Sequence, residues 1–161
     1  MRYAGIIEND IVNGEGISVS FWTQGCPHHC KGCHNPETWS FDGGKEDSLA
    51  NIYDKIIKAL KANNVKRNFS ILGGEPLCAE NIEEVFCITE RVKEVLPDTK
   101  IFLWTGYELD ELKNSYGEDL HFVLQYVDVL ITGRYKEELR DITQKWKGSS
   151  NQKVLYKGID F

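Results

Sequence analysis

Residues 69–76 read Phe-Ser-Ile-Leu-Gly-Gly-Glu-Pro, a short apolar run that stops at two glycines. An apolar run bounded by turn residues in this way is typical of a buried strand. Apolar residues then recur at helical spacing from Ile82 to Val92, and this second segment stops at Pro97-Asp98. The stretch therefore predicts a strand, a glycine turn and a helix in succession.

The same order of strand, turn and helix recurs on both sides of residues 69–76. Further strands are predicted at 17–22, 101–104, 127–131 and 153–156, and further helices at 49–60, around 109–112 and near 120–126. Alternating strands and helices are typical of an α/β fold with a parallel sheet. Because a complete barrel of eight such units takes about 250 residues, a partial barrel or an open sheet remains. We expect a partial (β/α) barrel of about five to six parallel strands, formed by residues 1–161 as a single domain.

Composition and charge exclude several classes of protein. The chain has 161 residues, with 25 acidic and 19 basic side chains and a formal net charge of −6. This acidic balance argues against a nucleic-acid partner, because binding to phosphates needs a surplus of Lys and Arg. No apolar run approaches the roughly 20 residues of a membrane span, and the first residues lack the apolar core of a signal peptide. We therefore expect a cytoplasmic protein with no membrane partner, in which disulfides are rare.

Three of the five cysteines form the most informative motif, Cys26-Pro-His-His-Cys30-Lys-Gly-Cys33, directly after the strand predicted at 17–22. Clustered thiolates on a flexible loop suit zinc or an iron–sulfur cluster. Zinc would need a fourth ligand, which one of the three nearby histidines could supply. An iron–sulfur cube held by three cysteines would leave one iron open for a substrate. The residues alone leave both possibilities open.

The histidines and the remaining cysteines have simpler interpretations. The three histidines near the cysteine motif are His28, His29 and His34, and the first two are expected to face solvent. The cysteines outside the motif, Cys78 and Cys87, are predicted to be small buried hydrophobic residues.

The motif Cys26-x-x-x-Cys30-x-x-Cys33, followed by Gly73-Gly74-Glu75-Pro76 after a later strand, resembles the signature of radical S-adenosylmethionine (radical SAM) enzymes. Three further segments narrow the resemblance: Asp10-Ile-Val-Asn-Gly14, Trp104-Thr-Gly-Tyr107 and Gly148-Ser-Ser-Asn-Gln152. Together these segments are similar to the anaerobic ribonucleoside-triphosphate reductase activating proteins. The resemblance runs from residue 10 to residue 152, which is nearly the whole chain.

This resemblance implies an oxidoreductase with a radical SAM fold that activates a glycyl-radical enzyme. In the family, S-adenosylmethionine is reductively cleaved at a 4Fe–4S cluster, and the resulting 5′-deoxyadenosyl radical forms a glycyl radical on the large subunit of the anaerobic reductase. An external flavodoxin or ferredoxin would donate the electron, because the chain is too short for a second redox domain.

Carried over residue by residue, the resemblance assigns Cys26, Cys30 and Cys33 as the three catalytic ligands of one cluster. It assigns contacts with S-adenosylmethionine to two segments, comprising Gly32, Cys33, His34, Gly73, Gly74, Glu75 and Pro76. Two alternatives remain beside this hypothesis. One is another short radical SAM enzyme, such as the activase of a different glycyl-radical enzyme, and the other is a zinc-stabilised interaction module without catalysis.

Overall fold

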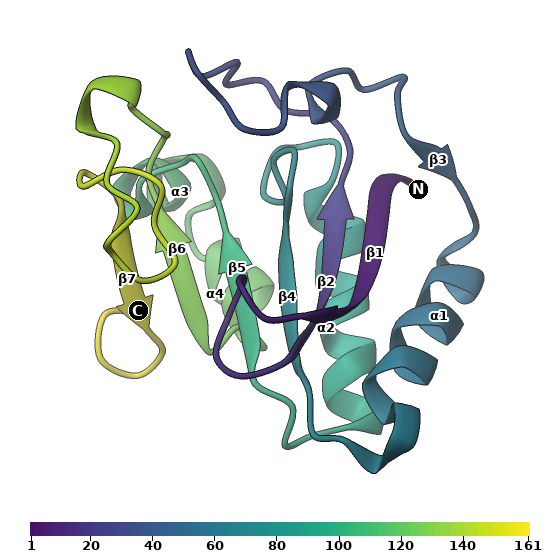
Figure 1. The fold of residues 1–161 in the computed structure, drawn as a ribbon. Coiled ribbons are helices and arrows are strands. Elements are labelled where there is room, and N and C mark those ends of the chain that lie inside the picture. The colour runs from purple at the N-terminus through teal and green to yellow at the C-terminus, as the bar shows by residue number, and fades with distance from the viewer.

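The computed structural model describes all residues from 1 to 161, and its framework is one seven-stranded sheet (Figure 1). The strands stand in the order β3-β1-β2-β4-β5-β6-β7. Their bounds are β1 Arg2–Asp10, β2 Ser18–Thr23, β3 Lys45–Glu46, β4 Asn68–Gly73, β5 Ile101–Trp104, β6 Val129–Thr132 and β7 Lys153–Tyr156. Strands β3 and β7 are the two edges, so hydrogen bonds do not close the sheet into a complete barrel.

Four α-helices accompany the sheet, and Figure 1 shows α2 and α4 packed behind it. The helices are α1 Leu49–Lys61, α2 Ile82–Val95, α3 Leu109–Tyr116 and α4 Asp119–Leu124, and the 3-10 turns are η1 Pro36–Thr38, η2 Ala62–Asn64 and η3 Glu137–Leu139. The Ser48 hydroxyl caps α1 by accepting a hydrogen bond of 3.2 Å from the amide of Asn51. A bilayer span would need a longer and more apolar helix than any of these.

The predicted mixed α/β architecture is confirmed, but the expected number of parallel strands was too high. Strands β2, β4, β5 and β6 run parallel, whereas β1, β3 and β7 pair with antiparallel neighbours. Parallel neighbours need a crossover, usually through a helix, and no α-helix lies between β6 and β7. The strand at 153–156 therefore returns beside β6 in the opposite direction. Strand β1, which the sequence pattern did not predict, forms a hairpin with β2.

Both faces of the sheet are buried, one mainly by helices and the other by loops. Twenty buried residues form the main core between sheet and helices, with Phe21, Phe69 and Leu103 among its strand residues. Alternate residues of a strand point to opposite faces, so Phe102 belongs to a second, smaller cluster with Val129 and Ile131. Loops rather than helices cover this second face, and the space beneath them is the cavity described below.

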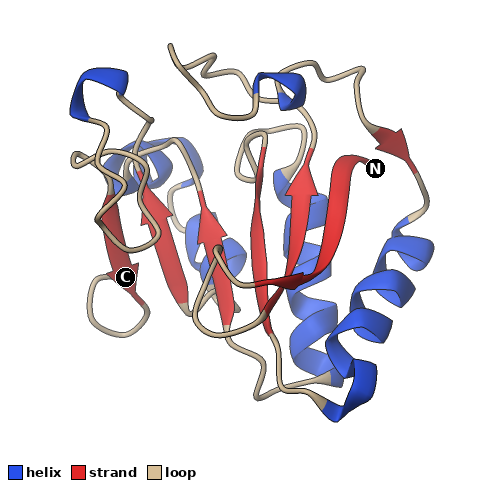
Figure 2. Cartoon of the chain, viewed as in Figure 1, coloured by secondary structure: helices blue, strands red, loops and turns tan.

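Loops of unrelated sequence gather where the parallel strands end. The arrowheads of β2, β5 and β6 in Figure 2 point towards the same end of the sheet, where long loops lie. These loops carry residues 24–44 after β2, 74–81 after β4, 105–108 after β5 and 133–152 after β6. Ligands of parallel α/β sheets bind at this carboxyl end. The fold thus brings the cysteine motif and the Gly73-Gly74 turn to one place.

Candidate metal and cofactor site

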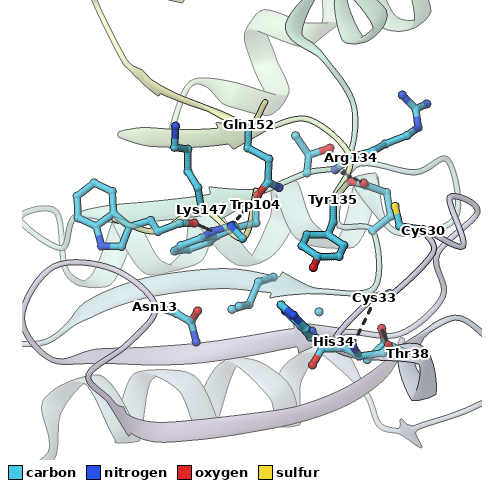
Figure 3. A pocket seen from close by; sticks show the side chains of 18 of the residues that line it. Asn13, Cys30, Cys33, His34, Thr38, Trp104, Arg134, Tyr135, Lys147 and Gln152 are labelled. Atoms are coloured by element: carbon cyan, nitrogen blue, oxygen red, sulfur yellow. Dashed lines mark hydrogen bonds between the residues drawn. The ribbon is translucent and has the colours of Figure 1, made fainter. Parts of the chain in front are cut away.

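A cavity of about 690 Å³ lies over the loop-covered face of the sheet, and all three cysteines of the motif line it. Figure 3 shows Cys30 and Cys33 at one end of this cavity and Asn13, from the β1–β2 loop, at the other. Trp104 lines its wall between these ends. The volume is that of a typical site for a small molecule or cofactor.

The cysteine loop is held closed at its base by a second segment of the same loop. The amide of Gly25 donates to the carbonyl of Thr38 over 2.8 Å, and the amide of Cys26 donates to the carbonyl of Trp39 over 3.0 Å. Gly25 has a φ of +94°, a conformation that glycine adopts without strain. The long irregular stretch after β2 is therefore an ordered platform that fixes where the first cysteine lies.

The thiols themselves sit in a turn that supplies polar contacts. The amide of Cys33 donates to the carbonyl of Cys30 over 3.1 Å, and the amide of Asn35 donates to the Cys33 sulfur over 3.4 Å. Burial, reinforced by the charge of Glu75, raises the pKa of the Cys26 thiol to about 11. Burial also raises the pKa of Cys30. Without a bound metal, the thiols of Cys26 and Cys30 therefore stay protonated at neutral pH.

The turn after β4 needs its two glycines because it packs against the cysteine loop backbone. The amides of Gly74 and Glu75 donate to the carbonyls of Thr23 and Gly25 over 3.0 and 2.8 Å. A Cβ on Gly73, whose φ is +108°, would lie 2.8 Å from the backbone of Thr23. A Cβ on Gly74 would lie 2.3 Å from the carbonyl oxygen of Gly25. The close approach of the two backbones therefore explains why positions 73 and 74 are both glycine, whether or not a ligand also contacts them.

Gly74→Ala is expected to push the turn away from the cysteine loop, because both colliding groups belong to the backbone and neither can rotate aside. We expect the free energy of unfolding to fall by about 1–3 kcal/mol, as for overpacked cores, together with the yield of reconstituted cluster. Gly5→Ala is the matched control, since a Cβ there would meet no atom within 4 Å. Urea unfolding and iron content would measure both effects, and equal behaviour of the two variants would contradict the packing argument.

Glu75 is a buried junction between three loops. Its side chain is 1% exposed. One carboxylate oxygen accepts hydrogen bonds from the Thr105 hydroxyl at 2.7 Å and the Leu77 amide at 2.9 Å. The other accepts from the Gly106 amide at 2.7 Å and from Nε2 of His28 at 2.8 Å. The carboxylate lies in the cavity wall, and these four bonds fasten the cysteine loop, the turn after β4 and the turn after β5 to one another.

The expectation that His28 faces solvent is wrong, because its side chain is only 6% exposed. Nε of Arg134 donates to Nδ1 of His28 over 3.2 Å, so Nε2 carries the proton that is shared with Glu75. Arg134 also donates from Nη1 to both carboxylate oxygens of Glu111, each at 3.0 Å. Gly106 leaves room for the ring, since a Cβ there would lie 2.4 Å from it. With both ring nitrogens engaged, His28 has no lone pair for a zinc ion.

The other two histidines of the loop occupy different surroundings. His29 is exposed, as predicted, and stacks on Trp39 with 4.7 Å between ring centroids. His34 lies against Tyr135 with 5.0 Å between centroids, and Figure 3 shows both rings at the cavity. No group of three His, Cys, Asp or Glu side chains forms a preformed metal site.

Five of the seven residues that the resemblance assigned to cofactor contact line the cavity: Cys33, His34, Gly73, Gly74 and Glu75. Gly32 and Pro76 lie outside its lining. Gly32 instead packs against Glu137, since a Cβ at position 32 would lie 2.8 Å from a carboxylate oxygen of that residue. Cys78 is buried, as predicted, whereas Cys87 is only partly buried, and neither lines the cavity.

Sequence reasoning missed Arg134 and Tyr135, which line the cavity beside the cysteines. They directly follow Gly133, at the carboxyl end of a parallel strand. That position is the signal that could have identified them, because residues after such strand ends face the ligand side of the sheet.

The family comparison defines the class to which this fold and site belong. The family model described as "4Fe-4S single cluster domain" matches residues 12–155. A protein from Haemophilus influenzae is 39% identical over 155 residues, and the aligned region covers 94% of this chain and 96% of the relative. A Vibrio cholerae relative is 39% identical and covers 96% and 97%, and one from Enterobacteria phage T4 is 34% identical and covers 96% and 93%.

All three relatives carry the name anaerobic ribonucleoside-triphosphate reductase-activating protein. With this identity over nearly the full length, the chain belongs to the family of anaerobic ribonucleoside-triphosphate reductase-activating proteins, within the single-cluster 4Fe–4S class. The resemblance noted in the sequence is thereby confirmed.

Proposed function

We propose that the protein is a radical SAM activase that forms a glycyl radical on the large subunit of an anaerobic ribonucleoside-triphosphate reductase. One observation carries the proposal: the three-cysteine motif and the Gly73-Gly74 turn, 40 positions apart from Cys33 to Gly73, meet at one cavity at the carboxyl ends of parallel strands. Membership of the family supports the same activity. The proposal treats residues 1–161 as one radical SAM domain and the sheet as a partial (β/α) barrel of that type.

The donor set fits one 4Fe–4S cluster held by Cys26, Cys30 and Cys33. Thiolates are the ligands that iron–sulfur clusters take, and neither Cys78 nor Cys87 lines the cavity to serve as a fourth. One iron would then keep a coordination position for S-adenosylmethionine. With one electron from an external donor, the cluster would supply the reductive cleavage of S-adenosylmethionine to methionine and a 5′-deoxyadenosyl radical, which would take a hydrogen atom from a glycine of the reductase.

The chain's own groups prepare the thiols for this role. Because burial raises the pKa of Cys26 to about 11 and also raises that of Cys30, binding of iron must displace protons from these sulfurs. The amide of Asn35 donates a hydrogen bond of 3.4 Å to the Cys33 sulfur, which orients this ligand. The Glu75 network holds the loop at a fixed distance from the sheet.

We assign the binding of S-adenosylmethionine to the wall formed by Cys33, His34, Gly73 and Gly74. Gly32 has no side chain that could stack on an adenine ring. Tyr135 and His34 instead supply the aromatic surface against which the adenine can pack. Glu75 also lines this wall, whereas Gly32 and Pro76 are the neighbours in sequence of its lining residues.

The electron donor in this proposal is an external flavodoxin or ferredoxin. Pro27, His29, Lys31 and Gly32 of the cysteine loop are all exposed. The loop therefore offers a redox partner a direct approach to the cluster from outside, away from the cavity.

The proposal is tested by electron paramagnetic resonance of anaerobically reconstituted, reduced protein. A reduced 4Fe–4S signal that changes on addition of S-adenosylmethionine is expected, because one iron is open to the cofactor. The same sample should release methionine and 5′-deoxyadenosine. A cluster signal indifferent to S-adenosylmethionine, or protein that retains zinc in place of iron and sulfide, would contradict the proposal.

A further inference from the structure

Three exposed aliphatic side chains gather at the mouth of the cavity. Ile11, Val12 and Ile142 are 76%, 73% and 76% exposed, and all three line the cavity that contains the cysteines. They come from two loops far apart in sequence, after β1 and after β6. No other strongly exposed large hydrophobic residue of the chain lines this cavity. Single exposed apolar residues are ordinary, but a group at the opening of a functional cavity is typical of a binding surface.

The loop that presents Ile11 and Val12 is held in place. The buried carboxylate of Asp10 accepts hydrogen bonds from the amides of Val12 and Asn13 at 2.8 and 3.1 Å, and from the Asn13 side chain at 2.8 Å. Burial opposes ionisation of Asp10, but hydrogen bonds from Ser20, Asn13 and the Val12 amide outweigh it, and the pKa of this carboxyl is lowered. The two aliphatic side chains are therefore displayed by an ordered turn, which reduces the entropy lost when they bind a partner.

The loop that carries Ile142 is fastened to the first one through Trp146. The indole nitrogen of Trp146 donates to the carbonyl of Gly14 over 2.9 Å, and the indole nitrogen of Trp104 donates to the carbonyl of Trp146 over 2.8 Å. Figure 1 shows the β1–β2 loop crossing in front of the sheet, on the face away from α2 and α4. The two loops thus form one continuous rim.

The rim also carries two lysines that form no ion pair. Lys145 and Lys147 line the cavity and neither forms an ion pair, whereas the other cation of the lining, Arg134, is paired with Glu111. Lys145 instead lies over the Trp146 ring, 4.5 Å from its centroid. Glu15 and Asp141 interact with Lys145 and Lys147 at longer range, but neither ammonium group is paired. An unpaired ammonium group at the mouth of the cavity favours a partner segment that carries carboxylates.

We propose that this rim, formed by Ile11, Val12, Ile142 and Lys145, is the docking surface for an extended segment of the reductase. The segment would cover the aliphatic side chains with its own and place a carboxylate at Lys145, which directs its backbone towards the cavity. The inference rests on the proposed function, because a backbone glycine must reach the bound cofactor. It adds the surface that captures the partner and the chemistry of the partner's segment.

The test compares an Ile11→Ser/Ile142→Ser double variant with Ile159→Ser. Ile159 is 83% exposed and lies outside the cavity lining, so it is a matched control. Two readouts are measured anaerobically on reconstituted protein: Kd for the purified reductase, and reduction-driven cleavage of S-adenosylmethionine without the reductase. We expect the double variant to weaken reductase binding by about 10-fold or more, the range for truncated interface anchors. Cleavage without the reductase, and both properties of the control, should stay within about twofold of wild type.

Lys145→Glu is a second variant that reverses a charge of the rim and leaves its three aliphatic side chains in place. It should weaken reductase binding, and the loss should shrink as salt is raised, because an exposed charge pair is screened. Unchanged reductase affinity in both variants would overturn the docking surface while leaving the proposed function intact. Loss of reductase-independent cleavage in the double variant would also overturn the docking surface, because Ile11 and Ile142 would then act in cofactor binding. Failure of wild-type protein to cleave S-adenosylmethionine would instead contradict the proposed function.

Discussion

Cys30→Ala is expected to reduce the 4Fe–4S signal and reductive cleavage of S-adenosylmethionine to background, a loss of at least about 100-fold. Removal of a residue that hydrogen-bonds to a metal ligand lowers metal affinity or activity by about 10–100-fold. Removal of a ligand itself should lower both by more. Cys30 is the middle cysteine of the motif in sequence and lines the cavity, and neither Cys78 nor Cys87 lines it to take over. Iron and sulfide content, together with electron paramagnetic resonance after anaerobic reconstitution, would measure the effect.

Cys87→Ala is the control for this substitution, because Cys87 belongs to α2 and does not line the cavity. It should keep wild-type iron content and cleavage. A Cys30→Ala protein with an intact cluster that still cleaves S-adenosylmethionine would remove the motif from the proposed role. Equal loss in both variants would mean that cysteine removal acts on folding rather than on ligation.

The sequence predicted the parallel part of the fold well, because its signals are local. The apolar run at 69–72 and the helical spacing after Ile82 became β4 and α2, and the run at 101–104 became β5. The direction of 153–156 was not predictable in the same way. Whether a strand runs parallel or antiparallel depends on the path of the preceding connection, and the connection before β7 is a loop without helical periodicity.

The candidate site was predicted in part for the same physical reason. The cysteines and the Gly73-Gly74 turn stand at strand ends, and the topology alone brings strand ends together. The His28 and Arg134 pair could not be foreseen, because their hydrogen bond spans 106 positions and depends on how two loops fold over the sheet edge. A histidine between two cysteines looks exposed in sequence, and only the buried carboxylate of Glu75 gives its ring a reason to turn inward.

Glu75→Gln is expected to lower the free energy of unfolding by about 1–3 kcal/mol, the cost of leaving a buried hydrogen-bond donor unsatisfied. The carboxylate accepts four hydrogen bonds, two on each oxygen. A glutamine retains one oxygen, so its amino group must face either the Leu77 amide or the Gly106 amide, neither of which can become an acceptor. His28 cannot compensate by exchanging its tautomer, because Nδ1 faces the Arg134 donor. Thermal or urea unfolding of metal-free and reconstituted protein would measure the loss.

Glu111→Gln separates this effect from a general loss of charge. Glu111 is also bonded to the network through Arg134, but its side chain is 41% exposed, and exposed ion pairs contribute only about 0–1 kcal/mol. The expected result is therefore a large loss of stability at position 75 and a small one at position 111. A Glu75→Gln protein that unfolds like wild type but no longer binds S-adenosylmethionine would contradict the junction role. That outcome would place the carboxylate, which lines the cavity, against the cofactor itself.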